Sequence, residues 1–171
     1  MDNYTLSQIL VSIAIVFDLL SFQFKTRKHV VLCLFIAGAL IATHFYLLNA
    51  FTAAVVMTIA SIRYLTSYFT SRPGVRNLFL IINGVTLFVT YESFISLVAF
   101  VGSCLQTIGA FSKDDREMRL IMMVGAVVWL SHNVLVLSPM AVVMEVLFLL
   151  SNIVAYLRFY NKSPIVTKSE Y

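Results

Sequence analysis

Five side chains with acidic, basic or imidazole groups stand inside long apolar segments of this sequence. They are Asp18, His44, Arg63, His132 and Glu145. A charged group at membrane depth costs about 3 kcal/mol on insertion scales, and it normally faces a partner or a water-filled cavity. These residues are therefore the first candidates for ion pairing, proton binding or solute contact.

Asp18 and Arg63 are candidates for an intramembrane ion pair. Asp18 stands about one helical turn, and Arg63 about two turns, before the basic stretch that follows its own apolar segment. This similar depth would let the two side chains meet. Two structural interpretations stay open: the pair locks two helices together, or Arg63 extends its charged head to the lipid headgroups. The functional alternative is that Arg63 contacts a solute or an inner gate.

His44, His132 and Glu145 are placed to form a second cluster, toward the other ends of their segments. An imidazole titrates near neutral pH, and a nearby carboxylate favours its charged form. We therefore expect a gate or a proton site here, with plain structural hydrogen bonding as the alternative. A metal site is not expected, because the sequence has no HExxH spacing and no further clear ligand.

Trp129, His132 and Asn133 share one helix face through their i, i+3, i+4 spacing. Trp129 could stack on a planar solute, and the amides of Asn133 and Asn152 could donate and accept hydrogen bonds. We expect a small polar solute to contact four residues: Arg63, Trp129, Asn133 and Asn152. An aromatic belt at the membrane surface is the alternative for Trp129.

No pattern of catalytic residues accompanies these groups. The sequence has no GxSxG, Walker, GxGxxG or paired CxxC motif. Cys33 and Cys104 both lie in apolar segments, which makes them apolar filler more readily than a disulfide. Asp114 and Asp115 stand in a charged stretch, where solvation is the simplest role. We therefore expect neither an enzyme nor a bound cofactor.

The elements that must position these residues are apolar segments of membrane-crossing length. The 171 residues are 60% hydrophobic and 12% charged, whereas soluble domains carry about 25% charged residues. A helix needs roughly 20 apolar residues to cross the hydrocarbon core, and lipid cannot satisfy free backbone groups, so helices are expected. We place seven crossings at residues 5–23, 29–48, 51–70, 76–91, 93–111, 119–137 and 140–160.

The basic residues predict the orientation of these crossings. Most of the 12 Lys and Arg residues fall in four short stretches. The stretches are Lys25/Arg27/Lys28, Arg72/Arg76, Lys113/Arg116/Arg119 and Arg158/Lys162/Lys168. The other hinges, at Leu48–Ala50, Tyr91–Glu92 and Leu137–Pro139, carry no Lys or Arg. Basic loops stay in the cytoplasm, so the N-terminus is expected outside and the C-terminus inside. The cations form no basic stripe, so nucleic acid is not an expected partner.

The fourth crossing is short and contains Asn83–Gly84, so it could merge with the fifth into one bent helix. That arrangement would place the basic stretches after residue 111 outside, and charge therefore favours seven crossings.

Seven crossings with a charge-poor fourth predict two three-helix units joined by a linker helix, a 3+1+3 arrangement. A shift of 88 residues superposes the hinges of residues 93–160 on those of 5–70, and it pairs His44 with His132 and Asp18 with Gln106. An odd linker at 76–91 leaves both units in the same orientation, as in SWEET transporters. The chain is then a single integral membrane domain over residues 1–171, with a polar cytoplasmic tail at 161–171.

Several stretches resemble one family, the bacterial YgjV inner membrane proteins. They are His44–Leu48, Ser61–Arg63, Trp129–Asn133, Met144–Glu145, Phe148–Leu150 with Asn152, and Arg158–Phe159. The family is grouped loosely with the PQ-loop and SWEET-like superfamily, which implies the 3+1+3 fold and transport of small solutes. Neither half of this chain has a Pro–Gln pair, so the helix kink made by that motif is not implied here.

The sequence therefore favours a small-solute transporter of the bacterial inner membrane that works by alternating access. Its partners would be the lipid bilayer and a small polar solute, and a homodimer stays open. The alternative is a non-transporting receptor or assembly protein that binds lipid or a cytoplasmic partner, since fold does not fix function.

Overall fold

The computed structural model describes residues 3–47, 51–91, 93–135 and 139–160. Seven α-helices occupy these ranges, and no strand is found in them. The helices are α1 (Asn3–Ser21), α2 (Arg27–Leu47), α3 (Phe51–Phe69), α4 (Pro73–Thr90), α5 (Phe94–Ala110), α6 (Asp115–Leu135) and α7 (Pro139–Tyr160). The predicted hinges at Leu48–Ala50, Glu92 and Leu137–Ser138, and the predicted tail, lie outside the described residues.

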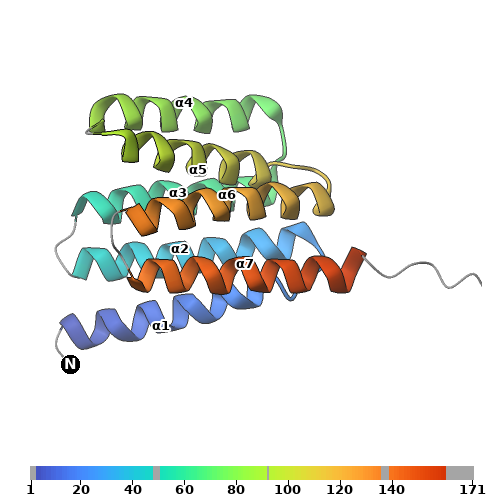
Figure 1. The fold of residues 1–171 in the computed structure, drawn as a ribbon, viewed down its shortest axis with the longest axis horizontal. Helices are drawn as coiled ribbons and strands as arrows, with labels where there is room; N and C mark the ends of the chain where they lie inside the picture. Colours follow the sequence, from blue (N-terminus) through green and yellow to red (C-terminus); the bar gives the residue numbers. More distant parts are fainter. Residues whose placement is uncertain (1–2, 48–50, 92, 136–138, 161–171) are drawn as a thin grey trace, which may run out of the picture.

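The prediction of an all-helical chain is confirmed, and each helix ends within a few residues of the predicted crossing. α4 and α5 are separate helices that lie side by side, not one bent crossing (Figure 1). Pro73 starts α4, where its missing N–H costs nothing. Ser93 caps α5 by accepting a hydrogen bond from the backbone N–H of Ile95.

α6 begins at Asp115, four residues before the predicted start of that crossing, because a carboxylate caps it. Asp114 Oδ1 accepts a hydrogen bond of 2.7 Å from the backbone N–H of Glu117, as expected for a helix N-cap. The expectation that Asp114 and Asp115 are merely solvated is therefore wrong. Asp114 fixes the start of α6, and Asp115 has a partner on α2, described below.

The helices form two groups with similar internal packing. α2 packs against α1 and α3, and α6 packs against α5 and α7, while α4 packs on the outer side of α5. The two groups contact each other where α1 meets α7 and where α3 meets α5. The hinges α1–α2, α3–α4 and α5–α6 and the C-terminal end of α7 all lie at one end of the bundle, on the right of Figure 1. We call this end, which carries the basic stretches, the basic end.

The 88-residue shift also relates the helix boundaries. α2 and α6 both contain 21 residues, and their bounds differ by 88 at each end. α3 and α7 begin at residues 51 and 139, the same shift. The shift converts α1 and α3 into α5 and α7, so it also interchanges the two contacts between the groups.

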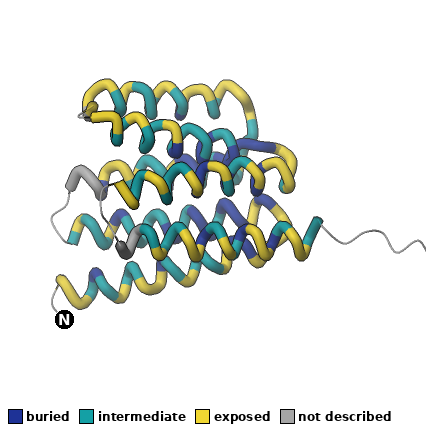
Figure 2. The backbone as a smooth tube through the Cα atoms, viewed as in Figure 1, coloured by how far each residue is buried: buried dark blue, intermediate teal, exposed yellow. Residues whose placement is uncertain are grey.

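The connected hydrophobic core lies in the basic half of the described bundle. It includes Phe22, Val30, Phe111, Met118 and Met122, all at or near the hinges of that end. Phe22 meets Phe148 of α7 edge to face, with ring centroids 4.4 Å apart. In the opposite half, the buried residues are mostly small, such as Ser7, Ala42 and Ala54, and Figure 2 shows most of the buried segments toward the basic end. The two ends are therefore packed differently.

Large apolar side chains cover the outside of the bundle. Phe88 is 89% exposed and Phe69 is 76% exposed, which suits contact with lipid chains. Within the described residues, four helices are long and apolar enough to cross a membrane: Asn3–Ser21, Arg27–Leu47, Asp115–Leu135 and Val142–Tyr160. Shorter apolar helices occupy Ala54–Phe69, Pro73–Val89 and Phe94–Ala110. The fold is thus a helical bundle with several apolar helices.

Candidate functional site

Arg63 of α3 is buried, with 6% of its surface exposed, and its guanidinium faces α5. Its Nη1 donates to Thr107 Oγ1 at 3.0 Å and to Ser103 Oγ at 3.4 Å. The guanidinium also lies over the ring of Tyr64, 4.8 Å from its centroid. Arg63 therefore does not extend to the lipid headgroups, and its polar partners in this structure are neutral.

The predicted ion pair between Asp18 and Arg63 is not formed among the described residues. Asp18 lies on α1, which contacts α2 and α7, whereas Arg63 points from α3 to α5. The carboxylate of Asp18 instead interacts electrostatically with Glu145 of α7. Tyr64 of α3 interacts electrostatically with Arg63, Asp18 and Glu145. Polar groups from α1, α3 and α7 thus converge on the interior.

The predicted cluster of His44, His132 and Glu145 is not assembled by any contact between described residues. His44 Nδ1 donates to the Ser7 carbonyl oxygen at 2.9 Å, which ties α2 to α1. His132 Nδ1 lies 3.2 Å from Asn133 Oδ1, within its own helix. Each imidazole therefore contacts only residues of its own three-helix group. Glu145 has Asp18 as its charged neighbour.

Trp129 packs against α5. A Cβ atom built on Gly102 would lie only 2.9 Å from Trp129 Nε1, so the indole rests directly on the glycine. The ring of His132 meets the indole edge to face, with centroids 5.2 Å apart. The structure thus brings together Trp129, His132 and Asn133, as their spacing predicts, but it places the indole in the seam between α5 and α6.

Asn152 is fully buried, and its partner is an arginine that sequence reasoning assigned to a surface stretch. Asn152 Nδ2 donates to the Arg119 backbone carbonyl at 3.2 Å, and Arg119 Nη1 lies 3.5 Å from Asn152 Oδ1. Arg119 itself is completely buried. Its Nη2 donates to the carbonyl oxygen of Phe24, in the hinge between α1 and α2.

Arg27 makes the counterpart of this contact from the other group of helices. It is 7% exposed, and its Nε donates to the Ser112 carbonyl oxygen at 2.7 Å, in the hinge between α5 and α6. Its Nη1 donates to the Ser67 carbonyl oxygen of α3 at 2.9 Å. Its backbone N–H donates to Asp115 Oδ1 at 2.7 Å.

The two arginines act reciprocally across the basic end. Each is anchored to the third helix of its own group, through Ser67 of α3 or Asn152 of α7. Each then donates to a hinge carbonyl of the other group, and those carbonyls, of Phe24 and Ser112, are related by the 88-residue shift. We call Arg27 and Arg119 with these acceptors the arginine clasp.

Sequence reasoning missed the clasp because basic residues near a hinge normally lie in solvent. One signal was available. Arg119 follows Asp115 by four residues, so it stands a full turn inside α6 and not in the loop. No comparable signal marks Arg27, which sits between exposed Lys25 and Lys28.

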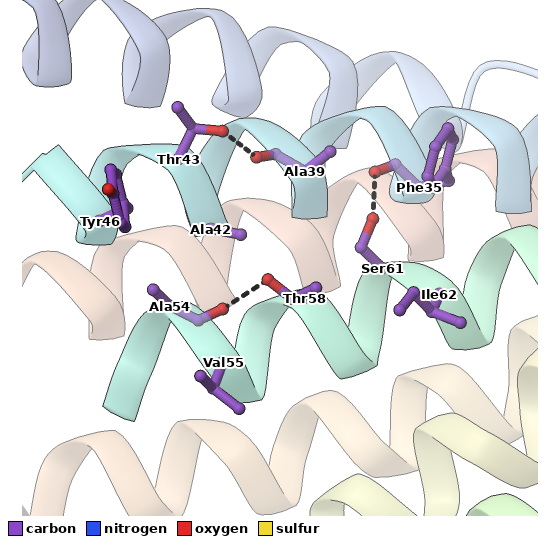
Figure 3. Close-up of a pocket in the computed structure, with 10 residues that line it drawn as sticks. All are labelled: Phe35, Ala39, Ala42, Thr43, Tyr46, Ala54, Val55, Thr58, Ser61 and Ile62. Carbon is purple, nitrogen blue, oxygen red and sulfur yellow. Dashed lines mark hydrogen bonds between the residues drawn. The ribbon is translucent and has the colours of Figure 1, made fainter. Parts of the chain in front are cut away.

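A groove of about 530 Å³ runs between α2 and α3 on the outside of the bundle (Figure 3). Three of its hydroxyls are already bonded to backbone carbonyls: Thr43 to Ala39, Thr58 to Ala54 and Ser61 to Phe35. Its lining is therefore apolar, and none of the predicted site residues belongs to it. Among the described residues, no group of three or more His, Cys, Asp or Glu side chains is placed to hold a metal ion.

Comparison with known proteins places the chain in one family. The family model Imp-YgjV, described as a bacterial inner membrane protein, matches residues 5–163. The chain is also similar to the inner membrane protein YgjV of Escherichia coli strain K12, with 25% identity over 94% of this chain and 88% of the relative. No solved structure matches it. The chain belongs to the Imp-YgjV family of bacterial inner membrane proteins.

Proposed function

We propose that this inner membrane protein of the YgjV family transports a small polar solute by alternating access. Seven crossings form two three-helix units, α1–α3 and α5–α7, with α4 as the linker. The units have the same orientation and rock against each other around a site near the membrane midplane, the organisation described for SWEET-like transporters. The N-terminus is periplasmic and the C-terminus cytoplasmic.

The relation between the two groups of helices supports this organisation. The bounds of α2 and α6 and the first residues of α3 and α7 coincide under one shift, and the contact of α1 with α7 corresponds to the contact of α3 with α5. Packing is extensive inside each group and limited between them. Units of this kind can move as rigid bodies, because few contacts have to be exchanged when they rock.

The observation that carries the proposal is the difference between the two ends of the bundle. At the basic end, the hydrophobic core and the arginine clasp hold the units together. In the other half, large buried apolar residues do not join the two units among the described residues. A transporter in one of its two states is closed at one end only, and a bundle whose large core residues gather at one end fits such a state better than it fits a static scaffold.

The interior residues then receive distinct roles. Arg63, Trp129 and Asn133 remain candidates for solute contact, and Asp18, Glu145, His44 and His132 for gating or proton binding. Asn152 is better assigned to the clasp, because both ends of its amide are engaged by Arg119.

Transport is tested with the purified protein in sealed vesicles. We expect vesicles with the protein to accumulate a member of a defined mixture of polar metabolites, read by mass spectrometry, above protein-free vesicles. A double variant, Arg27→Gln with Arg119→Gln, should change the uptake rate because the clasp must form and break in each cycle. Lys25→Gln, at an exposed cation of the same end, should not. Equal contents in vesicles with and without protein would overturn the proposal.

A second candidate is a non-transporting receptor or assembly protein. The groove between α2 and α3 favours it, because an open apolar groove lined by Ala39, Ala42 and Ala54 could hold an acyl chain or a partner helix. Ala39→Leu should then abolish partner binding, measured by co-purification, without affecting solute uptake.

A further inference from the structure

We infer that the solute carries an anionic oxygen group, a carboxylate or a phosphate, and that Arg63 binds this group between α3, α4 and α5. The inference rests on the proposed transport function and names the chemical class of the solute.

The neutral side chains around Arg63 already satisfy one another. Asn83 Nδ2 donates to Thr107 Oγ1 at 3.1 Å, and Ser103 Oγ donates to Asn83 Oδ1 at 3.2 Å. Thr107 Oγ1 donates to the Ser103 carbonyl oxygen at 2.8 Å. The network joins α4 to α5 and presents hydroxyl oxygens to Nη1 of Arg63. It positions the guanidinium and does not neutralise its charge.

The charge of Arg63 has no counter-ion among the described residues. Its polar partners are the neutral residues Ser103, Thr107 and Tyr64, and its Nε is buried without any hydrogen-bond partner. A buried charge without a partner is strongly unfavourable, and in membrane proteins such residues mark substrate or ion pathways. The partner that the protein does not provide is most simply supplied by the solute.

The geometry of the free group selects an oxyanion. A guanidinium binds carboxylate and phosphate oxygens through two parallel N–H donors, and the bonds are strengthened by charge. With Nη1 directed at α5, Nε is the buried donor that still lacks an acceptor, and we assign it to the anion. A neutral sugar hydroxyl would leave the positive charge unbalanced.

The test measures binding of lactate, inorganic phosphate and glycerol to the protein in lipid nanodiscs at constant ionic strength. Anion binding should raise the unfolding midpoint by mass action, and glycerol should not. Arg63→Gln should weaken anion binding by about 10- to 100-fold, the loss expected for a charged hydrogen-bonding group. Lys25→Gln is the matched control, and it should bind as the wild type does. A response to lactate alone identifies a carboxylate site, and a response to phosphate alone identifies a phosphate site.

The inference is overturned if neither anion binds the wild type, or if Arg63→Gln binds anions unchanged. If Arg63→Gln does not fold, Arg63→Lys replaces it. Lysine keeps the charge but loses the fork of donors, so anion binding should still weaken, and unchanged binding overturns the inference. Uptake of neutral solutes at the wild-type rate by Arg63→Gln vesicles would reject the anion site and leave the transport function standing. If vesicles with the wild-type protein take up no solute, both the anion site and the transport function are rejected.

Discussion

Buried arginines make more hydrogen bonds between the helices of this protein than its histidines do. Arg27, Arg63 and Arg119 are all buried, and each directs its donors to carbonyl or hydroxyl oxygens. A guanidinium has five N–H donors, and the last carbonyls of a helix lack intrahelical partners. The ends of α1, α3 and α5 therefore offer acceptors that only a long, multiply donating side chain can serve from a neighbouring helix.

Arg119→Lys should destabilise the folded protein because an ammonium cannot reach both Phe24 and Asn152. We expect a loss of about 1–3 kcal/mol, the usual worth of hydrogen bonds to a charged group. Chemical unfolding in detergent measures it. Arg158→Lys, at an exposed arginine of the same end, is the control and should change stability by less than about 0.5 kcal/mol. Equal stabilities of the two variants would show that the clasp contributes nothing.

Gly102→Ala should displace the side chain of Trp129, because the added methyl would lie 2.9 Å from its Nε1. Overpacking of this kind costs about 1–3 kcal/mol. Trp129 is the single tryptophan of the chain, so its fluorescence spectrum reports the displacement directly. Gly84→Ala is the control, since a methyl group added there would meet nothing within 4 Å. An unshifted emission maximum and an unchanged midpoint would contradict the packing described here.

The sequence predicted contacts within one helix better than contacts between helices. Trp129 and His132 do meet, because i, i+3 spacing on one helix fixes their distance whatever the tertiary structure. To predict the pairing of Asp18 with Arg63, one must know how α1 and α3 are rotated about their axes, and a single sequence does not give this. In the structure, Arg63 donates to Thr107 of α5, and Asp18 interacts with Glu145.

At the scale of helices, hydropathy and hinge composition were sufficient to place all seven elements. Lipid-exposed helices are apolar on every face, so their lengths can be predicted but their buried faces cannot. The largest difference at a helix start, at Asp115, resulted from a local cap by Asp114. Capping residues in a charged stretch are hard to separate from solvated ones, because Asp serves both roles.

The predicted membrane crossings that most need a test are those of α4 and α5. At 18 and 17 residues they are about 27 and 25 Å long, close to the thickness of a hydrocarbon core. In a variant with Cys33 and Cys104 replaced by alanine, we expect Ser93→Cys to react with an impermeant maleimide from the periplasm. Lys113→Cys, beyond the other end of α5, should react only after the cells are permeabilised. Labelling of both from one side would remove these crossings from the topology.

At the scale of the whole molecule, the asymmetry of the bundle can be combined with its charge. Lys and Arg are retained on the cytoplasmic side, which predicts that the basic end faces the cytoplasm. The core and the clasp lie at that end. Under the proposed topology and transport function, the structure would represent a state closed to the cytoplasm, and release of a solute there would require the hinge carbonyls of Phe24 and Ser112 to leave their arginines.

Loss of the clasp should therefore open the cytoplasmic end. Ser112 is only 9% exposed, so Ser112→Cys in the background without Cys33 and Cys104 should react slowly with a maleimide. Adding Arg27→Gln and Arg119→Gln removes the charged hydrogen bonds that hold the end shut, each worth about 1.5–3 kcal/mol. A factor of ten in a population corresponds to about 1.4 kcal/mol, so the reaction should accelerate at least about tenfold. Lys113→Cys, already exposed at the neighbouring position, should react at the same rate in both backgrounds. If Ser112→Cys reacts equally slowly without the arginines, the hydrophobic core alone closes this end, and the clasp is a structural brace that does not set the equilibrium between the two states.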